Sequence, residues 1–214
     1  MDEVVYRDIE QRDLPALKSL MAEAFGREWN FERLDPKSDF YAGMLEVYLN
    51  VFLSSATYGK VAVMDGRVVG AILVALNGEV KRFRLMKEDG VSSTLALLTG
   101  TDIERMTMAE VLTVPFESIA LLLENKVGNY DGSLDFFAVT QPARGLKIGK
   151  RLWSDAAAYC NDRNAKSISV ITNSGCNVGF YDFNGFSKVD ATETLCNYPT
   201  GQRKFDTLLY DYRF

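Results

Sequence analysis

The chain has 214 residues, 47% hydrophobic and 25% charged, a composition typical of one soluble globular domain. Its net charge of -5 argues against broad nucleic-acid binding, and it holds no apolar run near the roughly 20 residues that cross a bilayer. It contains no histidine, which excludes Ser-His-Asp and Cys-His nucleophilic sites and most zinc-hydrolase sites.

The first third of the chain predicts a strand, two helices and a hairpin. Asp13 is expected to cap the first helix and Gly26 to close it. Asp65-Gly66 separates two runs rich in valine, isoleucine and alanine, which predicts a hairpin with a type I′ turn. The predicted elements are residues 4–7, 14–25, 40–52, 61–64 and 68–76.

Residues 78–131 break the run of clearly predicted strands and helices, and they predict a helical insertion between two strands of one sheet. Short helical patterns occur at residues 93–98, 107–112 and 116–124, and Thr107 and Glu110 have the spacing of a capping box. Two interpretations stay open at this point. The insertion covers an active site as a lid, or it only packs against the sheet.

The last third predicts a strand that leads into a helix, then a strand, a short helix and final strands. The helix is expected to bury Leu152, Trp153, Ala156, Ala157 and Cys160. The order of elements predicts an α/β (α+β) fold, a mixed sheet with helices on both faces, and a single domain over residues 1–214. The predicted elements begin with a strand at 134–139 and continue with a strand at 167–171, a helix at 178–183 and strands that include 205–212.

The junction between strand 134–139 and the following helix is rich in glycine and positive charge. A helix that begins after a glycine-rich turn presents unpaired N–H groups and a positive dipole end, which together bind phosphate. Gly145 and Gly149 allow a ligand to approach the main chain, and Arg144, Lys147 and Lys150 add charge. The spacing fits neither a Walker loop nor the Rossmann fingerprint.

The junction, Val139-Thr140-Gln141-Pro142-x-Arg144-Gly145-x-x-Ile148-Gly149-x-x-Leu152, resembles motif A of the GNAT family of N-acetyltransferases. Further along, Phe180-Tyr181-Asp182-Phe183-Asn184-Gly185-Phe186 resembles that family's motif B. The resemblance implies a mostly antiparallel, twisted GNAT-type sheet. It also implies an acyl-CoA-dependent enzyme that transfers an acetyl group from acetyl-CoA, used as a co-substrate, to the amine of a small molecule.

The resemblance also implies where acetyl-CoA binds. In the family, amides of a splayed strand bind the pantetheine arm and polarise the thioester, and amides of the loop hold the pyrophosphate. The strand positions here are Phe137, Ala138 and Val139, and the loop positions are Arg144, Gly145, Leu146, Lys147, Ile148, Gly149 and Lys150. Lys147 replaces a glycine of the family pattern, so its side chain must point away from the phosphates or pair with one.

Candidates for acid and base follow from the same resemblance. Tyr181 matches the family position that often protonates the leaving thiolate; the alternative is a packing role. Ser133 occupies the position of a glutamate base, and Asp135, two residues on, is expected to face the same side of the strand. A solvated aspartate, one that binds a cationic substrate, or proton loss through water are equally open. Asn173 and Asn177 are expected to bond pantetheine amides, or else to satisfy their own turn.

The remaining expectations concern alternatives and partners. A non-catalytic acyl-CoA-binding or sensing protein is the second reading, and a structural protein that binds no CoA is the third. Three cysteines without metal-type spacing and an acidic N-terminus predict a cytoplasmic protein with no metal site. We expect no nucleic-acid or membrane partner, and a homodimer is compatible with the sequence. The residues do not identify the acceptor amine, although the acidic charge mildly favours a cationic one.

Overall fold

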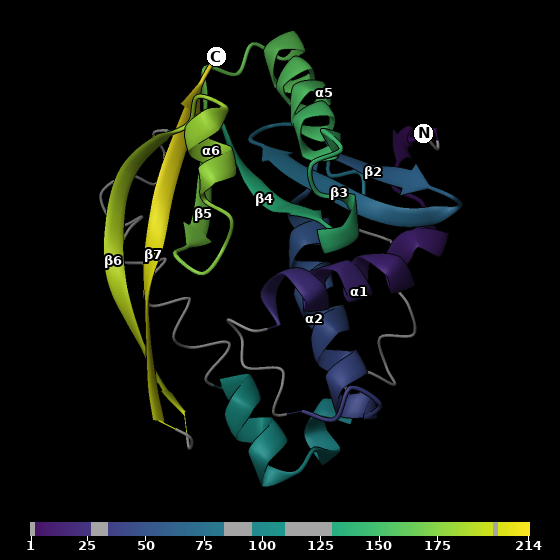
Figure 1. Cartoon of the computed structure of the whole chain (residues 1–214), viewed down its shortest axis with the longest axis vertical. Helices are drawn as coiled ribbons and strands as arrows, with labels where there is room; N and C mark the ends of the chain where they lie inside the picture. Colours follow the sequence, from purple (N-terminus) through teal and green to yellow (C-terminus); the bar gives the residue numbers. More distant parts are fainter. Residues whose placement is uncertain (1–2, 27–33, 84–95, 110–129, 199–200) are drawn as a thin grey trace.

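The computed structural model describes residues 3–26, 34–83, 96–109, 130–198 and 201–214. Its core is a seven-stranded sheet in the order β1-β2-β3-β4-β5-β7-β6 (Figure 1). Neighbouring strands are antiparallel except for β4 and β5, which are parallel. This confirms the predicted mixed, mostly antiparallel sheet. The strands are β1 (Val5–Asp8), β2 (Tyr58–Met64), β3 (Arg67–Leu76), β4 (Gly132–Val139), β5 (Ser167–Asn173), β6 (Ser187–Tyr198) and β7 (Gly201–Arg213).

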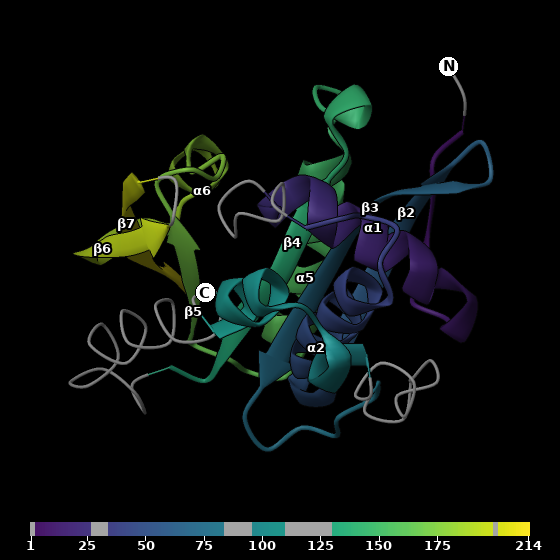
Figure 2. The ribbon, with the colours of Figure 1, turned by 90° about the horizontal axis from the view of Figure 1, so that it is seen from below.

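Helices cover both faces of the sheet (Figure 2). Helices α1 (Leu14–Phe25) and α2 (Asp39–Ser55) share one apolar core with β2, β3 and β4. Helices α5 (Ile148–Asp162) and α6 (Gly179–Phe183) share a second core on the opposite face. Within the described part of the chain, no helix is both long enough and apolar enough to span a membrane.

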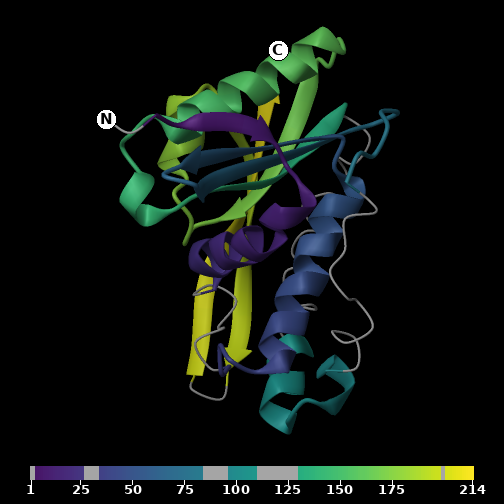
Figure 3. The same cartoon turned by 90° about the vertical axis from the view of Figure 1, so that its right-hand side faces the viewer.

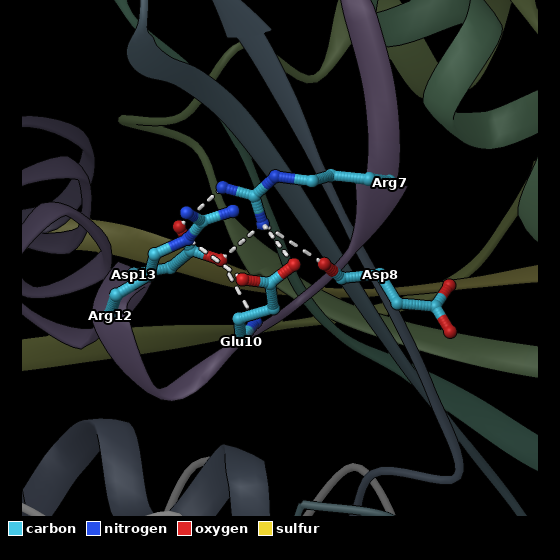
Figure 4. A network of polar contacts seen from close by, with 5 residues as sticks. All are labelled: Arg7, Asp8, Glu10, Arg12 and Asp13. Atoms are coloured by element: carbon cyan, nitrogen blue, oxygen red, sulfur yellow. Dashed lines mark hydrogen bonds and ion pairs between the residues drawn. The ribbon is translucent and has the colours of Figure 1, made fainter.

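The connection from β1 to α1 is fixed by ion pairs around Asp13 (Figure 4). Asp13 occupies the predicted N-cap position of α1, but its carboxylate makes no capping bond there. It instead accepts hydrogen bonds from both terminal nitrogens of Arg7, at 2.6 and 2.7 Å, and from the Glu10 N–H at 2.8 Å. Burial acts to raise the pKa of Asp13, but these bonds and the charges of Arg7 and Arg12 hold it below its ordinary value.

The predicted hairpin of β2 and β3 is confirmed. Asp65 and Gly66 both have positive φ angles, 51° and 74°, as a type I′ turn requires at its two central residues. The turn twists the two strands in the right-handed sense of the sheet. Strand β3 lies between β2 and β4.

The predicted insertion is described only in part, since residues 84–95 and 110–129 lie outside the described residues. Residues 96–99 and 102–109 are helical and lie beside the beginning of α2 (Figure 3). The prediction of a capping box at Thr107 is wrong, because Thr107 lies inside a helix and its hydroxyl donates to the Ile103 carbonyl. The cap is formed by Thr101 and Glu104, which have the same spacing. The predicted helix at 116–124 lies outside the described residues.

Candidate active site

Strands β4 and β5 separate after two residue pairs. They pair only at Gly132 with Ile168 and at Ser133 with Ser169, after which β4 follows β3 and β5 follows β7 (Figure 1). Thr140 N–H donates to the Val69 carbonyl on β3 at 2.9 Å. Because successive residues of a strand point their N–H groups to opposite sides, those of Val139 and Phe137 point into the split.

A cavity of about 1160 Å³ occupies this split and reaches both faces of the sheet. Pockets for one small ligand usually measure about 300–1,000 Å³, so this cavity has room for more than one. Every predicted site residue lines it except Leu146, which is exposed beside it. The predicted residues that line it are Asp135, Phe137, Ala138, Val139, Arg144, Gly145, Lys147, Ile148, Gly149, Lys150, Asn173, Asn177 and Tyr181.

The loop before α5 has the backbone of an anion-binding turn. Gly145 and Lys147 both adopt left-handed conformations, with φ angles of 83° and 62°. Arg144 is extended, and α5 begins directly after Lys147, so the first N–H groups of the helix have no acceptor within it. Lys147 adopts a backbone conformation that glycine takes more readily, at a cost of about 1–2 kcal/mol for a residue with a side chain.

Gly149 allows the first turn of α5 to lie against an aromatic wall. A Cβ atom at this position would be 3.2 Å from Phe137 Cζ and 3.5 Å from Phe180 Cε2. The rings of Phe137 and Phe180 contact each other at a centroid distance of 4.7 Å. A larger side chain at position 149 would have to displace these rings or enter the cavity.

Asp135 lies in a β-bulge. Leu73 pairs with Phe136 and Val74 pairs with Leu134, so Asp135 has no partner on β3. The bulge places Leu134 in the α5-side core and Phe136 in the α1-side core. Two adjacent residues, Asp135 and Phe136, thereby face α1 and α2.

Two serine hydroxyls hold the Asp135 carboxylate. Ser133 donates to Oδ1, which confirms that Ser133 and Asp135 face the same side, and Ser55 of α2 donates to Oδ2 at 2.8 Å. Burial raises the pKa of Asp135 above its ordinary value, and the two hydrogen bonds offset part of that rise. A carboxylate with a raised pKa is a better proton acceptor than an exposed one.

Tyr181 lies on the other side of the split. Its ring contacts Phe186 and Tyr210 at centroid distances of 5.3 and 5.4 Å, and its residue is 9% exposed. Burial raises the pKa of its hydroxyl well above the ordinary value. The phenol is protonated at neutral pH, and burial makes it a weaker acid than an exposed tyrosine.

Asn173 and Asn177, the two predicted pantetheine contacts, flank the turn after β5. The Asn173 side-chain oxygen accepts the Gly175 N–H at 2.9 Å, as the local alternative expected for a loop asparagine.

Two residues of the site are not predicted from the sequence. Glu23 lines the cavity and accepts the Gln141 N–H at 2.7 Å, and Ser55 donates to Asp135 beside the cavity. Both belong to the N-terminal helices, where no motif marks them.

The family described as "Acetyltransferase (GNAT) family" matches residues 14–186. No curated protein matches the chain.

Solved structures match along the whole chain. An apo agmatine N-acetyltransferase has a TM-score of 0.62 at 13% identity, with all of both chains covered. The Drosophila melanogaster polyamine N-acetyltransferase has a TM-score of 0.56 at 12% identity, covering 99% of this chain and 100% of the other. The PaiA N-acetyltransferase of Thermoplasma acidophilum, in complex with coenzyme A, has a TM-score of 0.53 at 12% identity, covering 99% of each chain. At these identities the likeness shows the fold.

Proposed function

Because the chain belongs to the GNAT family of acetyltransferases, we propose that it transfers the acetyl group of acetyl-CoA to the amine of a small molecule. The observation that carries this proposal is the continuous cavity through the split. It has the anion-binding loop on one face of the sheet, and Asp135 and Tyr181 where the strands diverge.

The donor site is proposed on the face that α5 covers. N–H groups from Arg144 to Lys150 bind the pyrophosphate, and the side chains of Arg144, Lys147 and Lys150 supply positive charge. Phe137, Ala138 and Val139 follow the pantetheine arm, with the N–H groups of Phe137 and Val139 pointing into the split. Asn177, which lines the cavity beside the turn, is a further candidate for a pantetheine contact.

The chemistry removes two protons from the acceptor nitrogen and supplies one to the leaving thiolate. Asp135 accepts a proton from the acceptor ammonium, and the free amine nitrogen forms a bond to the thioester carbon. N–H groups of β4 stabilise the oxyanion that develops, a contribution of roughly 3–4 kcal/mol per well-placed donor. The carbon–sulfur bond then breaks, and the Tyr181 hydroxyl protonates the thiolate that leaves. The Tyr181 phenolate takes the second proton from the acylated nitrogen through water, so the amide is neutral and the proton on Asp135 is released to solvent.

A non-catalytic acyl-CoA sensor is the alternative function. It was suggested by Lys147 in place of a glycine and by Ser133 in place of a glutamate. Lys147 keeps the glycine-like backbone, and Ser133 supports a neighbouring carboxylate with a raised pKa, so neither residue favours the sensor. Two of the similar structures are an agmatine and a polyamine N-acetyltransferase, which supports a small amine as acceptor.

The test combines binding and turnover. Calorimetry measures CoA binding, and a thiol-release assay with acetyl-CoA measures transfer to a panel of small amines. We expect CoA binding together with amine-dependent thiol release that Asp135→Asn abolishes. Tight CoA binding without turnover on any amine would support the sensor, and a protein that binds no CoA would refute both functions.

A further inference from the structure

The face of the cavity opposite the phosphate-binding loop is formed by α1, α2 and β7. Because α5 and α6 cover one face of the sheet and α1 and α2 the other, an acceptor and acetyl-CoA can enter from opposite faces and meet at the split. We call this side the acceptor chamber. Its lining consists of Asp135, Phe25, Val47, Tyr48, Val51, Phe52 and Phe205.

The wall of the acceptor chamber is apolar, and its rings pack on the core beneath them. Phe25 of α1 and Phe52 of α2 both pack on the buried ring of Phe136, each at a centroid distance of 5.8 Å. Tyr48 and Phe52 lie one helical turn apart on α2, so they extend the wall along a single side of that helix. An aromatic or branched apolar group would find contacts on several sides here.

The polar end of the chamber is formed by the Asp135 carboxylate and the Ser55 hydroxyl that binds it. Ser55 follows Phe52 by three residues on α2 and holds the Asp135 carboxylate, so the helix that builds the wall also orients the charge. Among the described residues that line the cavity, Asp135 and Glu23 carry the negative charges. Glu23 is exposed on α1 and its carboxylate accepts the Gln141 N–H, whereas Asp135 is the partly buried carboxylate that the described part of the chamber offers.

This arrangement separates two kinds of amine. A monoamine places its ammonium at Asp135 and its body against the wall of the acceptor chamber, which Phe25, Tyr48 and Phe52 form. A diamine or polyamine would also bring a second ammonium into apolar surroundings, where an unpaired charge is costly.

We propose that the acceptor is a primary monoamine with an aromatic or branched apolar body, and that the chamber selects against diamines and polyamines. This inference rests on the proposed function and names the substrate class of the same site.

The experiment compares 2-phenylethylamine with 1,4-diaminobutane and agmatine in the thiol-release assay. We expect kcat/KM to be at least about tenfold higher for 2-phenylethylamine, the discrimination that apolar pockets commonly reach. Higher kcat/KM for either dication would overturn the acceptor class while leaving the proposed transferase function intact. Absence of turnover with all three and with a wider amine panel would overturn both.

Two variants locate the selectivity in the chamber. Val51 lines the chamber and is 50% exposed, so Val51→Asp adds a second carboxylate there with little effect on the core. We expect this variant to reduce the preference for the monoamine by at least about tenfold. Ser54→Asp adds the same charge on an exposed part of α2 outside the cavity and should leave the preference unchanged.

A further variant, Phe52→Leu, tests the chamber without adding a charge, in case Val51→Asp folds poorly. Phe52→Leu shortens the wall and should raise KM for 2-phenylethylamine while KM for acetyl-CoA stays constant. Unchanged acceptor preference in both Val51→Asp and Phe52→Leu, with normal melting curves, would overturn the assignment of the chamber.

Discussion

Gly149 offers the sharpest test of the donor site. Gly149→Glu would place a Cβ 3.2 Å from Phe137 Cζ and extend a carboxylate toward the cavity beside Lys150. At an effective dielectric constant of 20, a carboxylate roughly 4–5 Å from one phosphate charge is repelled by about 3–4 kcal/mol. This repulsion corresponds to a loss of CoA affinity of more than about a hundredfold.

Isothermal titration calorimetry with CoA measures this loss, and two controls divide it into its causes. Gly149→Gln has nearly the same volume without the charge, so it reports the steric effect alone. Gly149→Ala adds only the Cβ, which needs the Phe137 ring to move by a few tenths of an ångström. We expect affinity to fall in the order Gly, Ala, Gln, Glu, and the difference between Gln and Glu to shrink at high salt.

Circular dichroism must show that the variants keep their fold. The position lies in the first turn of α5 at the cavity, so any destabilisation should stay within the roughly 1–3 kcal/mol typical of overpacking. CoA affinity in folded Gly149→Glu that equals the wild-type affinity would refute the assignment of this loop to the pyrophosphate.

Three further predictions concern single side chains. Tyr181→Phe should lower kcat by about 10²-fold or more in the thiol-release assay, with unchanged CoA affinity, because a general acid acts only on the leaving thiolate; undiminished kcat would leave Tyr181 a packing role. Asp135→Asn should abolish turnover, and the kcat/KM of the wild type should fall at low pH as Asp135 takes up a proton. Because the folded-state pKa of Asp135 is raised, its contribution to stability is present below its unfolded pKa and is lost as pH rises through the folded pKa. The asparagine variant should therefore melt at a higher temperature than wild type at pH 8 but not at pH 3. Asp13→Ala should reduce the free energy of unfolding at pH 7 by about 1.5–3 kcal/mol, because it removes the charged hydrogen bonds of Arg7 and leaves that side chain the 3.9 Å ion pair with Glu10. The pKa of Asp13 is lowered, so this difference should be present above its unfolded pKa and disappear as pH falls through the folded one, as urea titrations at several pH values would show; an equal difference at pH 2 would contradict the ion-pair explanation.

The elements that the sequence predicts correctly are those with local causes. The β2–β3 hairpin depends on Asp65 and Gly66, which adopt the positive φ angles of a type I′ turn with little strain. The helix after the junction depends on apolar spacing over 15 residues, and its buried face includes the predicted Leu152, Trp153, Ala156 and Cys160. Neither feature needs information from distant parts of the chain.

The parts that sequence reasoning missed depend on distant contacts or on competing local signals. Ser55 and Asp135 are 80 positions apart, so residues near Asp135 in the sequence could not identify the hydroxyl that α2 supplies. In the insertion, Thr101 and Thr107 both precede a glutamate by three residues, so spacing alone could not choose between them. Asp13 was expected to cap a helix, but Arg7 offers its carboxylate a charged, bidentate partner.

The position of the split follows from how the strands are connected. Antiparallel neighbours such as β2 and β3 are joined by a tight turn that holds their ends together, and β6 and β7 are likewise adjacent in the chain. Strands β4 and β5 are parallel, so their connection passes over the sheet through α5 and no turn holds their carboxyl ends together. Each strand keeps a full ladder on its other side, with β3 or with β7, and this limits the cost of separating them. The donors that lose their ladder partners are the N–H groups of Phe137 and Val139, which are also the groups proposed to bind the pantetheine arm. Strands β4 and β5 therefore separate at the parallel boundary of the described sheet, and acetyl-CoA bound there would pair with the two N–H groups of β4 that lose their ladder partners.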